Sequence, residues 1–257
     1  MPTANKTSLK QVLRDECLPA LARQAPYFST GAMAAGLRRR KLTCPPATLN
    51  RYLHEFKRAG LIYDAGRGWY SSLATPFTLN REPVSSLVQE LNKTFPLLDF
   101  SVWSTEQIAS YGHHLLAKFV SFVHTDRDSM PSVFEFLRDK GFDAHLNPRG
   151  AAASQFTVRE RTVVVRPKVT TQPAEEHFVT IEGLLVELFV ESRDLHLVDG
   201  SEYARIFSNL TRAGRILMGR FAEYAGKRKP ATTDLLESIN RQFSTNHPLI
   251  DSDAATP

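Results

Sequence analysis

The chain has 257 residues, of which 42% are hydrophobic and 23% are charged, as in an ordinary globular protein. No apolar run of about 18 residues occurs, which argues against a transmembrane helix, and the N-terminus lacks the apolar core of a signal peptide, so we expect a cytoplasmic protein. The two cysteines and the scattered histidines match neither a disulfide framework nor a zinc site, so no metal and no cofactor are expected. Cys17 lies on an apolar helical stripe and is expected to be a core residue.

The net charge of +5 is unevenly distributed along the chain. Residues 1–75 hold 12 Lys and Arg against 4 Asp and Glu, whereas the remainder holds 20 against 23. This asymmetry is typical of a nucleic-acid-binding domain joined to a domain with another role, although a basic surface also serves solubility. We predict three parts: a DNA-binding domain over residues 1–75, a second domain over residues 76–225, and a polar tail over residues 226–257.

Three helices are predicted in the basic N-terminal part. Apolar residues at three- and four-residue spacing predict the first helix over Leu9–Leu21, with Ser8 as its N-cap. Ser29 or Thr30 is placed to cap a short second helix that ends at Leu37. A basic turn follows, made of Arg38, Arg39, Arg40 and Lys41.

The third predicted helix has two different faces. Pro45 and Pro46 suit its first turn, and Gly60 ends it. Its apolar stripe consists of Leu49, Tyr52, Leu53 and Phe56. The opposite side carries groups that pair with phosphates and base edges. With the basic turn and a hairpin described next, the candidate DNA-contacting residues are Arg38, Arg39, Arg40, Lys41, Thr48, Asn50, Arg51, His54, Lys57, Arg58 and Arg67.

Residues 61–70 predict a β-hairpin, because two short β-prone runs flank a glycine-containing turn with Arg67 at its tip. Three helices followed by such a hairpin are the pattern of a winged helix-turn-helix. Its third helix would enter the major groove of duplex DNA, and Arg67 would touch the backbone or the minor groove. A purely structural or protein-binding role of this module is the alternative.

The second part alternates between strand-like and helix-like segments, which predicts a mixed α/β domain. Ser104 is placed to cap one of its helices, which would run past Ile108 to Leu115, and Asp126 or Asp128 the next, which Gly141 would end. Strands are expected at residues 97–103, 119–124, 144–146 and 162–165, and a surface loop at 147–161. Helices are expected at residues 84–91, 104–115, 133–137, 175–191, 206–210 and 216–221, with one weak amphipathic stretch at 235–243.

No short catalytic signature is present: the chain has no GxSxG, no Walker loop and no GxGxxG. Asp99, Glu160 and Lys168 are the nearest set to the carboxylates and lysine of a metal-dependent nuclease, but their spacing does not match. We therefore expect a protein that is not an enzyme, with a DNA-targeted nuclease as the remote alternative.

The order of segments resembles the AbiEi-type antitoxins of bacterial abortive-infection toxin–antitoxin pairs. It consists of the predicted winged helix, FPLLDFSVW, KFVSFVHTDRDSMPSVFEFLRDKGFDAHLNP, VVVRPKV and TIEGLLVELF, and covers residues 8–225. The family has no short catalytic signature, so the resemblance implies no active-site residue. Glu182 and Glu187 occupy the places of two acidic residues in the family's apolar helix.

The resemblance implies a function with two parts. An N-terminal winged helix represses its own operon by binding promoter DNA, and an α/β domain neutralises a nucleotidyltransferase toxin, directly or by opposing its effect. The partners would be double-stranded promoter DNA and this toxin, with no membrane. A winged-helix regulator whose second domain senses a small ligand is the alternative from another class.

Overall fold

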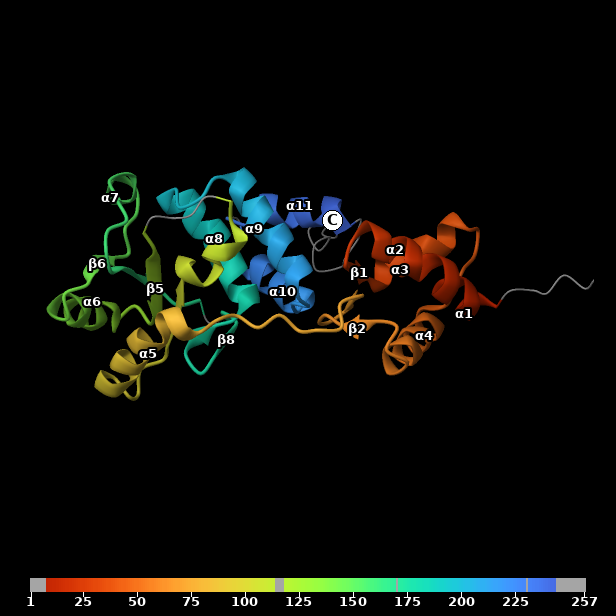
Figure 1. Ribbon diagram of the computed structural model, residues 1–257, viewed down its shortest axis with the longest axis horizontal. Coiled ribbons are helices and arrows are strands. Elements are labelled where there is room, and N and C mark those ends of the chain that lie inside the picture. Colours follow the sequence, from red (N-terminus) through yellow and green to blue (C-terminus); the bar gives the residue numbers. More distant parts are fainter. Residues whose placement is uncertain (1–7, 114–117, 170, 230, 244–257) are drawn as a thin grey trace, which may run out of the picture. The chain divides into compact units, whose positions relative to one another are not determined.

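The computed structural model describes residues 8–113, 118–169, 171–229 and 231–243, which form two compact units (Figure 1). Unit 1 contains residues up to Phe77 together with those from Thr211 onward, and unit 2 contains Thr78–Leu210. The expected mixed α/β class is confirmed. The division of the chain differs from the predicted one, because residues 211–225 belong with the N-terminal part and not with the second domain.

Three helical segments build the first part of unit 1. A continuous stretch consists of α1 (Leu9–Val12), a π-helical turn (Leu13–Cys17) and α2 (Leu18–Gln24). It is followed by α3 (Thr30–Arg39) and α4 (Pro46–Arg58). The predicted caps are confirmed: the Ser8 hydroxyl accepts from the Gln11 amide, and the Ser29 hydroxyl accepts from the Ala32 amide. Cys17 is buried, and this burial raises the pKa of its thiol.

A small antiparallel sheet completes this part of unit 1. Its strands are β1 (Tyr27–Ser29), β2 (Tyr63–Asp64) and β3 (Trp69–Ser71), in the order β1-β3-β2. The predicted hairpin of β2 and β3 is confirmed, whereas β1 was not expected. Strand β1 lies between α2 and α3 in the chain and is only three residues long. Its sequence is therefore too short to show the alternating pattern by which a strand is predicted.

The C-terminal segment contributes two helices to unit 1, α10 (Met218–Lys227) and α11 (Thr233–Phe243). Before α10, Arg215 pairs with Pro76 in an isolated parallel bridge. Ile216, Met218 and Phe221 are fully buried. The region from residue 226 onward, predicted as a polar tail, therefore includes a helix whose Leu235 and Leu236 are buried.

Unit 2 is built on a mixed six-stranded sheet in the order β6-β7-β5-β4-β9-β8. The strands are β4 (Phe100–Ser104), β5 (Val120–Thr125), β6 (Asp143–Leu146), β7 (Thr162–Pro167), β8 (Ala174–Glu175) and β9 (Phe178–Val179). The helices are α5 (Glu82–Thr94), a 3₁₀ helix η2 (Thr105–Tyr111), α6 (Met130–Asp139), α7 (Ala151–Ser154), α8 (Ile181–Leu195) and α9 (Gly200–Ala213), whose last residues fall beyond the unit boundary.

Both faces of this sheet are buried. Helices α5 and α6 pack on one face through a cluster that includes Phe100, Val102 and Val123. The strand residues that alternate with these core residues point to the other face, since successive side chains of a strand lie on opposite faces. There Arg166 of β7 bonds to Glu191 of α8, which places α8 over this second face.

Several predicted boundaries in unit 2 are wrong. Leu97 is fully exposed, and the strand predicted from it begins at Phe100. Glu175 lies in β8, and the helix predicted from it begins at Ile181. The expected loop 147–161 contains the short helix α7. Ser104 does cap the following helix, which is 3₁₀ and ends at Tyr111, and Leu115 lies outside the described residues.

Within the described part of the chain, no helix combines the length and the apolar character that crossing a membrane requires.

Candidate nucleic-acid interface

The exposed face of α4 carries most of the predicted DNA-contacting residues. Leu49, Leu53 and Phe56 are buried on its inner side. The exposed residues are Asn50, Arg51, His54, Lys57 and Arg58, with Thr48 half-buried. The helical periodicity read from the sequence therefore assigns these side chains to the correct faces.

Arg51 is held loosely on this face. Its guanidinium lies 5.2 Å from the centre of the neighbouring Tyr52 ring and its Nε lies 3.9 Å from a carboxylate oxygen of Glu55. Glu55 is bound more closely by Lys10, at 2.6 Å. An exposed ion pair of this length contributes little, so Arg51 is available to a stronger anionic partner.

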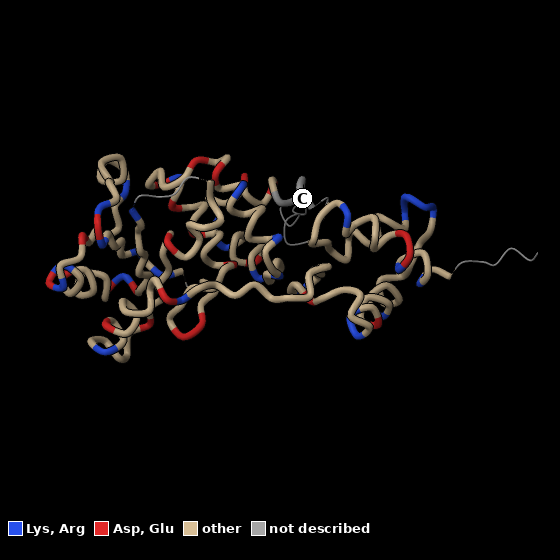
Figure 2. The backbone as a smooth tube through the Cα atoms, in the orientation of Figure 1, with Lys and Arg blue, Asp and Glu red and all other residues tan. Residues whose placement is uncertain are grey.

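The basic run from Arg38 to Lys41, predicted as a turn after a helix that ends at Leu37, includes the last two residues of α3. It divides into a structural arginine and three exposed cations. The Arg40 guanidinium donates to Glu16 at 2.8 Å and to the Gly36 carbonyl at 3.0 Å, which ties the turn to the preceding helices. Arg38, Arg39 and Lys41 are exposed and make no ion pair among the residues that the structure describes. Figure 2 marks this turn and the end of α4 as basic.

The end of α4 is joined to the hairpin by one ion pair. Lys57 Nζ lies 3.2 Å from Asp64 Oδ2 of β2, and Asp64 Oδ1 accepts from the Gly66 amide at 2.9 Å. Partial burial acts to raise the pKa of Asp64, but the bonds from Gly66 and Lys57 outweigh it and hold the pKa below its usual value. Helix α4 and the hairpin are thus joined by this polar contact.

Arg67 is exposed at the hairpin tip, as predicted, but the main chain of the tip contacts the C-terminal segment of unit 1. Gly66 and Gly68 both have positive φ, at 94° and 75°, which favours glycine in this turn. The Gly219 amide of the C-terminal segment donates to the Ala65 carbonyl at 2.9 Å. This packing partner was missed by the sequence reasoning, and the apolar run 216–218 before Gly219 is the only signal that pointed to it.

The residues considered for a nuclease site do not come together in unit 2. Lys168 and Asp99 form an ion pair beside the end of β7. Glu160 precedes the start of the same strand. Six strand residues separate the two ends, which is about 20 Å. Among the described residues, no group of three or more His, Cys, Asp or Glu side chains is placed to hold a metal ion.

Two deeply buried charges of unit 2 form an internal ion pair. Arg166 and Glu191 are each 1% exposed, and Arg166 Nε donates to Glu191 Oε1 at 2.9 Å. Arg166 Nη1 also donates to the Asn147 side chain at 3.1 Å and to the Pro148 carbonyl at 2.8 Å. The guanidinium thereby fastens β7, the loop after β6 and helix α8 to one another.

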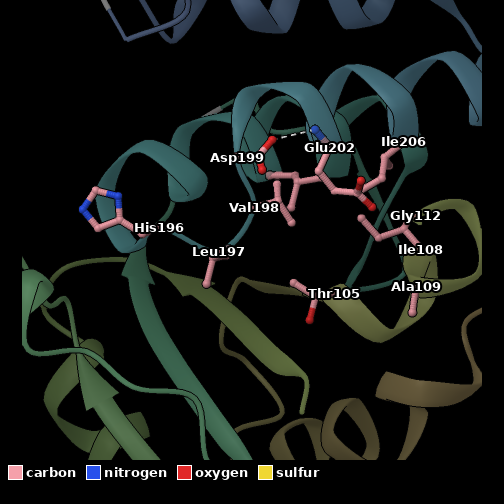
Figure 3. Close-up of a pocket in the computed structure, with 11 residues that line it drawn as sticks. Thr105, Ile108, Ala109, Gly112, His196, Leu197, Val198, Asp199, Glu202 and Ile206 are labelled. Atoms are coloured by element: carbon pink, nitrogen blue, oxygen red, sulfur yellow. Dashed lines mark hydrogen bonds between the residues drawn. The ribbon is translucent and has the colours of Figure 1, made fainter. Parts of the chain in front are cut away.

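A cavity of about 200 Å³ lies between η2, the end of α8 and the start of α9 (Figure 3). Ile108, Leu188 and Ile206 supply apolar walls. Its two carboxylates are engaged within the protein: Glu202 accepts from the His113 amide, and Asp199 Oδ1 accepts from the Glu202 amide at 2.8 Å. A small, largely apolar molecule fits this chemistry better than a polar substrate.

The sequence matches a family described as "Family of unknown function (DUF6577)" over residues 48–245. The chain belongs to the DUF6577 family. No curated protein and no solved structure matches it. The DUF6577 match begins within α4 and runs through unit 2 to the end of α11. The matched range therefore includes both the exposed face of α4 and the C-terminal segment that packs on the hairpin.

Proposed function

We propose that unit 1 is a winged helix-turn-helix that binds duplex DNA, and that the protein is an antitoxin which represses its own operon. The observation that carries the DNA-binding part is the face of α4, where Arg51, His54 and Arg58 are exposed opposite a buried apolar stripe. Unit 1 as a whole holds 19 Lys and Arg against 9 Asp and Glu, a net charge of +10.

The order of elements supports this proposal. Unit 1 runs helix, strand, helix, helix, strand, strand, with a short turn between α3 and α4. In a winged helix the second helix of such a pair enters the major groove, and the hairpin lies beside it. We assign Asn50, Arg51 and Arg58 to the groove, and Arg38, Arg39 and Lys41 to the phosphates.

Unit 2 is the proposed antitoxin part, and its charge supports a separate role. It holds 13 Lys and Arg against 18 Asp and Glu, a net charge of −5, which disfavours contact with DNA. The resemblance to antitoxins places Glu182 and Glu187 in α8, but these side chains are 5% and 0% exposed. We therefore assign them to the packing of α8 and not to the surface that meets a toxin.

Titration of the full chain against a duplex from the region upstream of its own gene tests DNA binding. Because Arg51 and Arg58 are assigned to base edges, Arg51→Ala and Arg58→Ala are each expected to weaken specific binding about 5- to 150-fold, equivalent to about 1–3 kcal/mol. The control Arg127→Ala removes an exposed arginine of unit 2 and should bind as the wild type does. Unchanged affinity in both α4 variants would remove the assignment of α4.

Growth of a bacterial host with the adjacent gene under inducible control tests the antitoxin part. Rescue of a toxic neighbour by this protein supports neutralisation. A harmless neighbour, or toxicity that persists, removes the antitoxin proposal. The ligand-sensing regulator then takes its place, because the cavity beside α9 offers a site of the kind that a small apolar effector occupies.

A further inference from the structure

The tip of the β2–β3 hairpin packs against the start of α10 through main-chain atoms. The Gly219 amide donates to the Ala65 carbonyl at 2.9 Å. A Cβ at Gly219 would lie 2.6 Å from the Arg67 amide nitrogen and 2.9 Å from the Gly66 carbonyl carbon. Real Cβ atoms essentially never approach such atoms within 3.0 Å, so a larger residue at this position forces one of the two main chains to move. The hairpin tip and α10 therefore meet at a point where only glycine fits.

We propose that residues 214–221 position the hairpin tip for contact with DNA, with Gly219 as the positioning residue and Arg67 as the residue that meets a phosphate. Arg67 is exposed and forms no ion pair within the part of the chain that the structure describes. Gly219 acts through the main chain of the tip and does not itself touch the duplex. The inference rests on the proposed DNA binding and adds to it a segment that lies far from the hairpin in sequence.

Arg67 lies between two glycines whose main chains are held from outside the hairpin. On one side Gly66 lies against Gly219. On the other side the Gly68 carbonyl accepts from the Thr30 amide at 3.0 Å, which ties it to the start of α3. The main chain at the tip is therefore fixed before any partner arrives. A side chain carried on a fixed main chain loses less conformational entropy when it binds, so this packing favours a phosphate contact.

The start of α10 is held more firmly than the hairpin tip. Residues 214–216 bind the Tyr27 hydroxyl through a main-chain carbonyl and a main-chain amide, each at 2.9 Å. Met218 and Phe221, on either side of Gly219, are each 0% exposed. A larger residue at position 219 should therefore displace the tip and leave the start of α10 in place. The exposed arginine of the tip would then move away from its phosphate.

The experiment measures the affinity of the full chain for the duplex upstream of its own gene at several salt concentrations. Each phosphate contact adds about 0.9 to the slope of log affinity against log salt, so Arg67→Ala is expected to lower the slope by about 0.9. Gly219→Ala is expected to lower it by a similar amount although it changes no charge, because the displaced tip no longer reaches its phosphate. A substitution that only reduced stability would leave the slope of the folded protein unchanged. The double variant should have the slope of Arg67→Ala.

Gly226→Ala is the matched control, because Gly226 lies in the same helix and a Cβ there would meet nothing within 4 Å. This variant should keep the wild-type slope. Circular dichroism checks that each variant is folded. If Gly219→Ala does not fold, Tyr27→Phe takes its place, since it removes both bonds to residues 214–216 without a change of charge. It should also lower the slope, and a wild-type slope in it would contradict the inference.

The other outcomes separate this inference from the proposed function. A wild-type slope in Gly219→Ala beside a lower slope in Arg67→Ala overturns the inference and leaves the tip as a contact that needs no support. A double variant whose slope lies below that of Arg67→Ala also overturns it, because the segment then acts on another contact. If Arg67→Ala itself keeps the wild-type slope, the inference is wrong, while loss of binding in Arg51→Ala and Arg58→Ala still supports the proposed function. If the wild-type protein binds no duplex, both fail.

Discussion

Two arginines of unit 1 and one of unit 2 lie in opposite environments. In unit 1, Arg51 and Arg58 are exposed on α4, opposite an apolar core, and contribute to a net charge of +10. In unit 2, whose net charge is −5, Arg166 is 1% exposed and bonded on three sides. A charge at the surface costs little to keep and is available to a partner, whereas a buried charge must be satisfied from within.

The same substitution should therefore have different consequences at these exposed positions and at the buried one. Replacement of an exposed arginine should change what the protein binds and leave its stability nearly unchanged. Replacement of the buried arginine should change stability first. The first of three measurements tests this contrast directly, and the other two test polar contacts within unit 1.

The largest effect is expected at the buried pair of unit 2. Arg166→Ala leaves the Glu191 carboxylate buried without its partner, so we expect the free energy of unfolding to fall by about 3–5 kcal/mol. Urea denaturation measures it. The matched variant Arg58→Ala should stay within about 0.5 kcal/mol of the wild type. A double replacement, Arg166→Met with Glu191→Leu, should recover most of the loss, and a loss as large as that of Arg166→Ala would contradict this account.

A smaller effect is expected where residues 214–216 contact β1 in unit 1. Tyr27→Phe removes the hydroxyl that bonds to Gly214 and Ile216 and leaves a buried carbonyl and a buried amide without it. The expected cost is about 1–3 kcal/mol of unfolding free energy. Tyr52→Phe, on the half-buried side of α4, is the matched control. Equal stability of the two variants would show that the C-terminal segment adds little to unit 1.

The smallest effect concerns the hairpin and depends on pH. Since the folded state holds the pKa of Asp64 below its usual value, the charged carboxylate stabilises the fold at neutral pH. This contribution is present above the unfolded pKa of about 3.9 and is lost as the pH falls through the lowered folded value. Asp64→Asn should therefore be less stable than the wild type at neutral pH, and the difference should vanish in acid. A difference that does not depend on pH would contradict the role assigned to the Lys57 pair.

The helices of unit 1 were predictable because their signals are local. Ser8 and Ser29 cap the residues that directly follow them, and the stripe of α4 repeats within one helix. In unit 2 the strong apolar strands were predictable for the same reason. The helix predicted over residues 175–191 is present as α8, but its predicted start was wrong, because β8 and β9 have only two residues each and carry no period of their own.

The candidate interface was predictable only in part. The exposed residues of α4 and Arg67 follow from periodicity and from the glycines of the turn. The structural role of Arg40 was not foreseen, because Glu16 lies 24 residues away in the chain. The packing of Gly219 on the hairpin was not foreseen, because the apolar run 216–218 beside it indicates burial but not the partner.

The sequence by itself determined the charge asymmetry, the two faces of α4 and the alternation of strands and helices in unit 2. These features depend on side chains within a few residues of one another, where helix and strand geometry relates spacing directly to direction. Only the tertiary structure decided that the described residues after Thr211 form one unit with the N-terminal part and that Arg166 lies inside the other. Tyr27 and Gly214 are 187 residues apart, and contacts at such separation arise from the shape of the packed surfaces, which no local pattern in the sequence records.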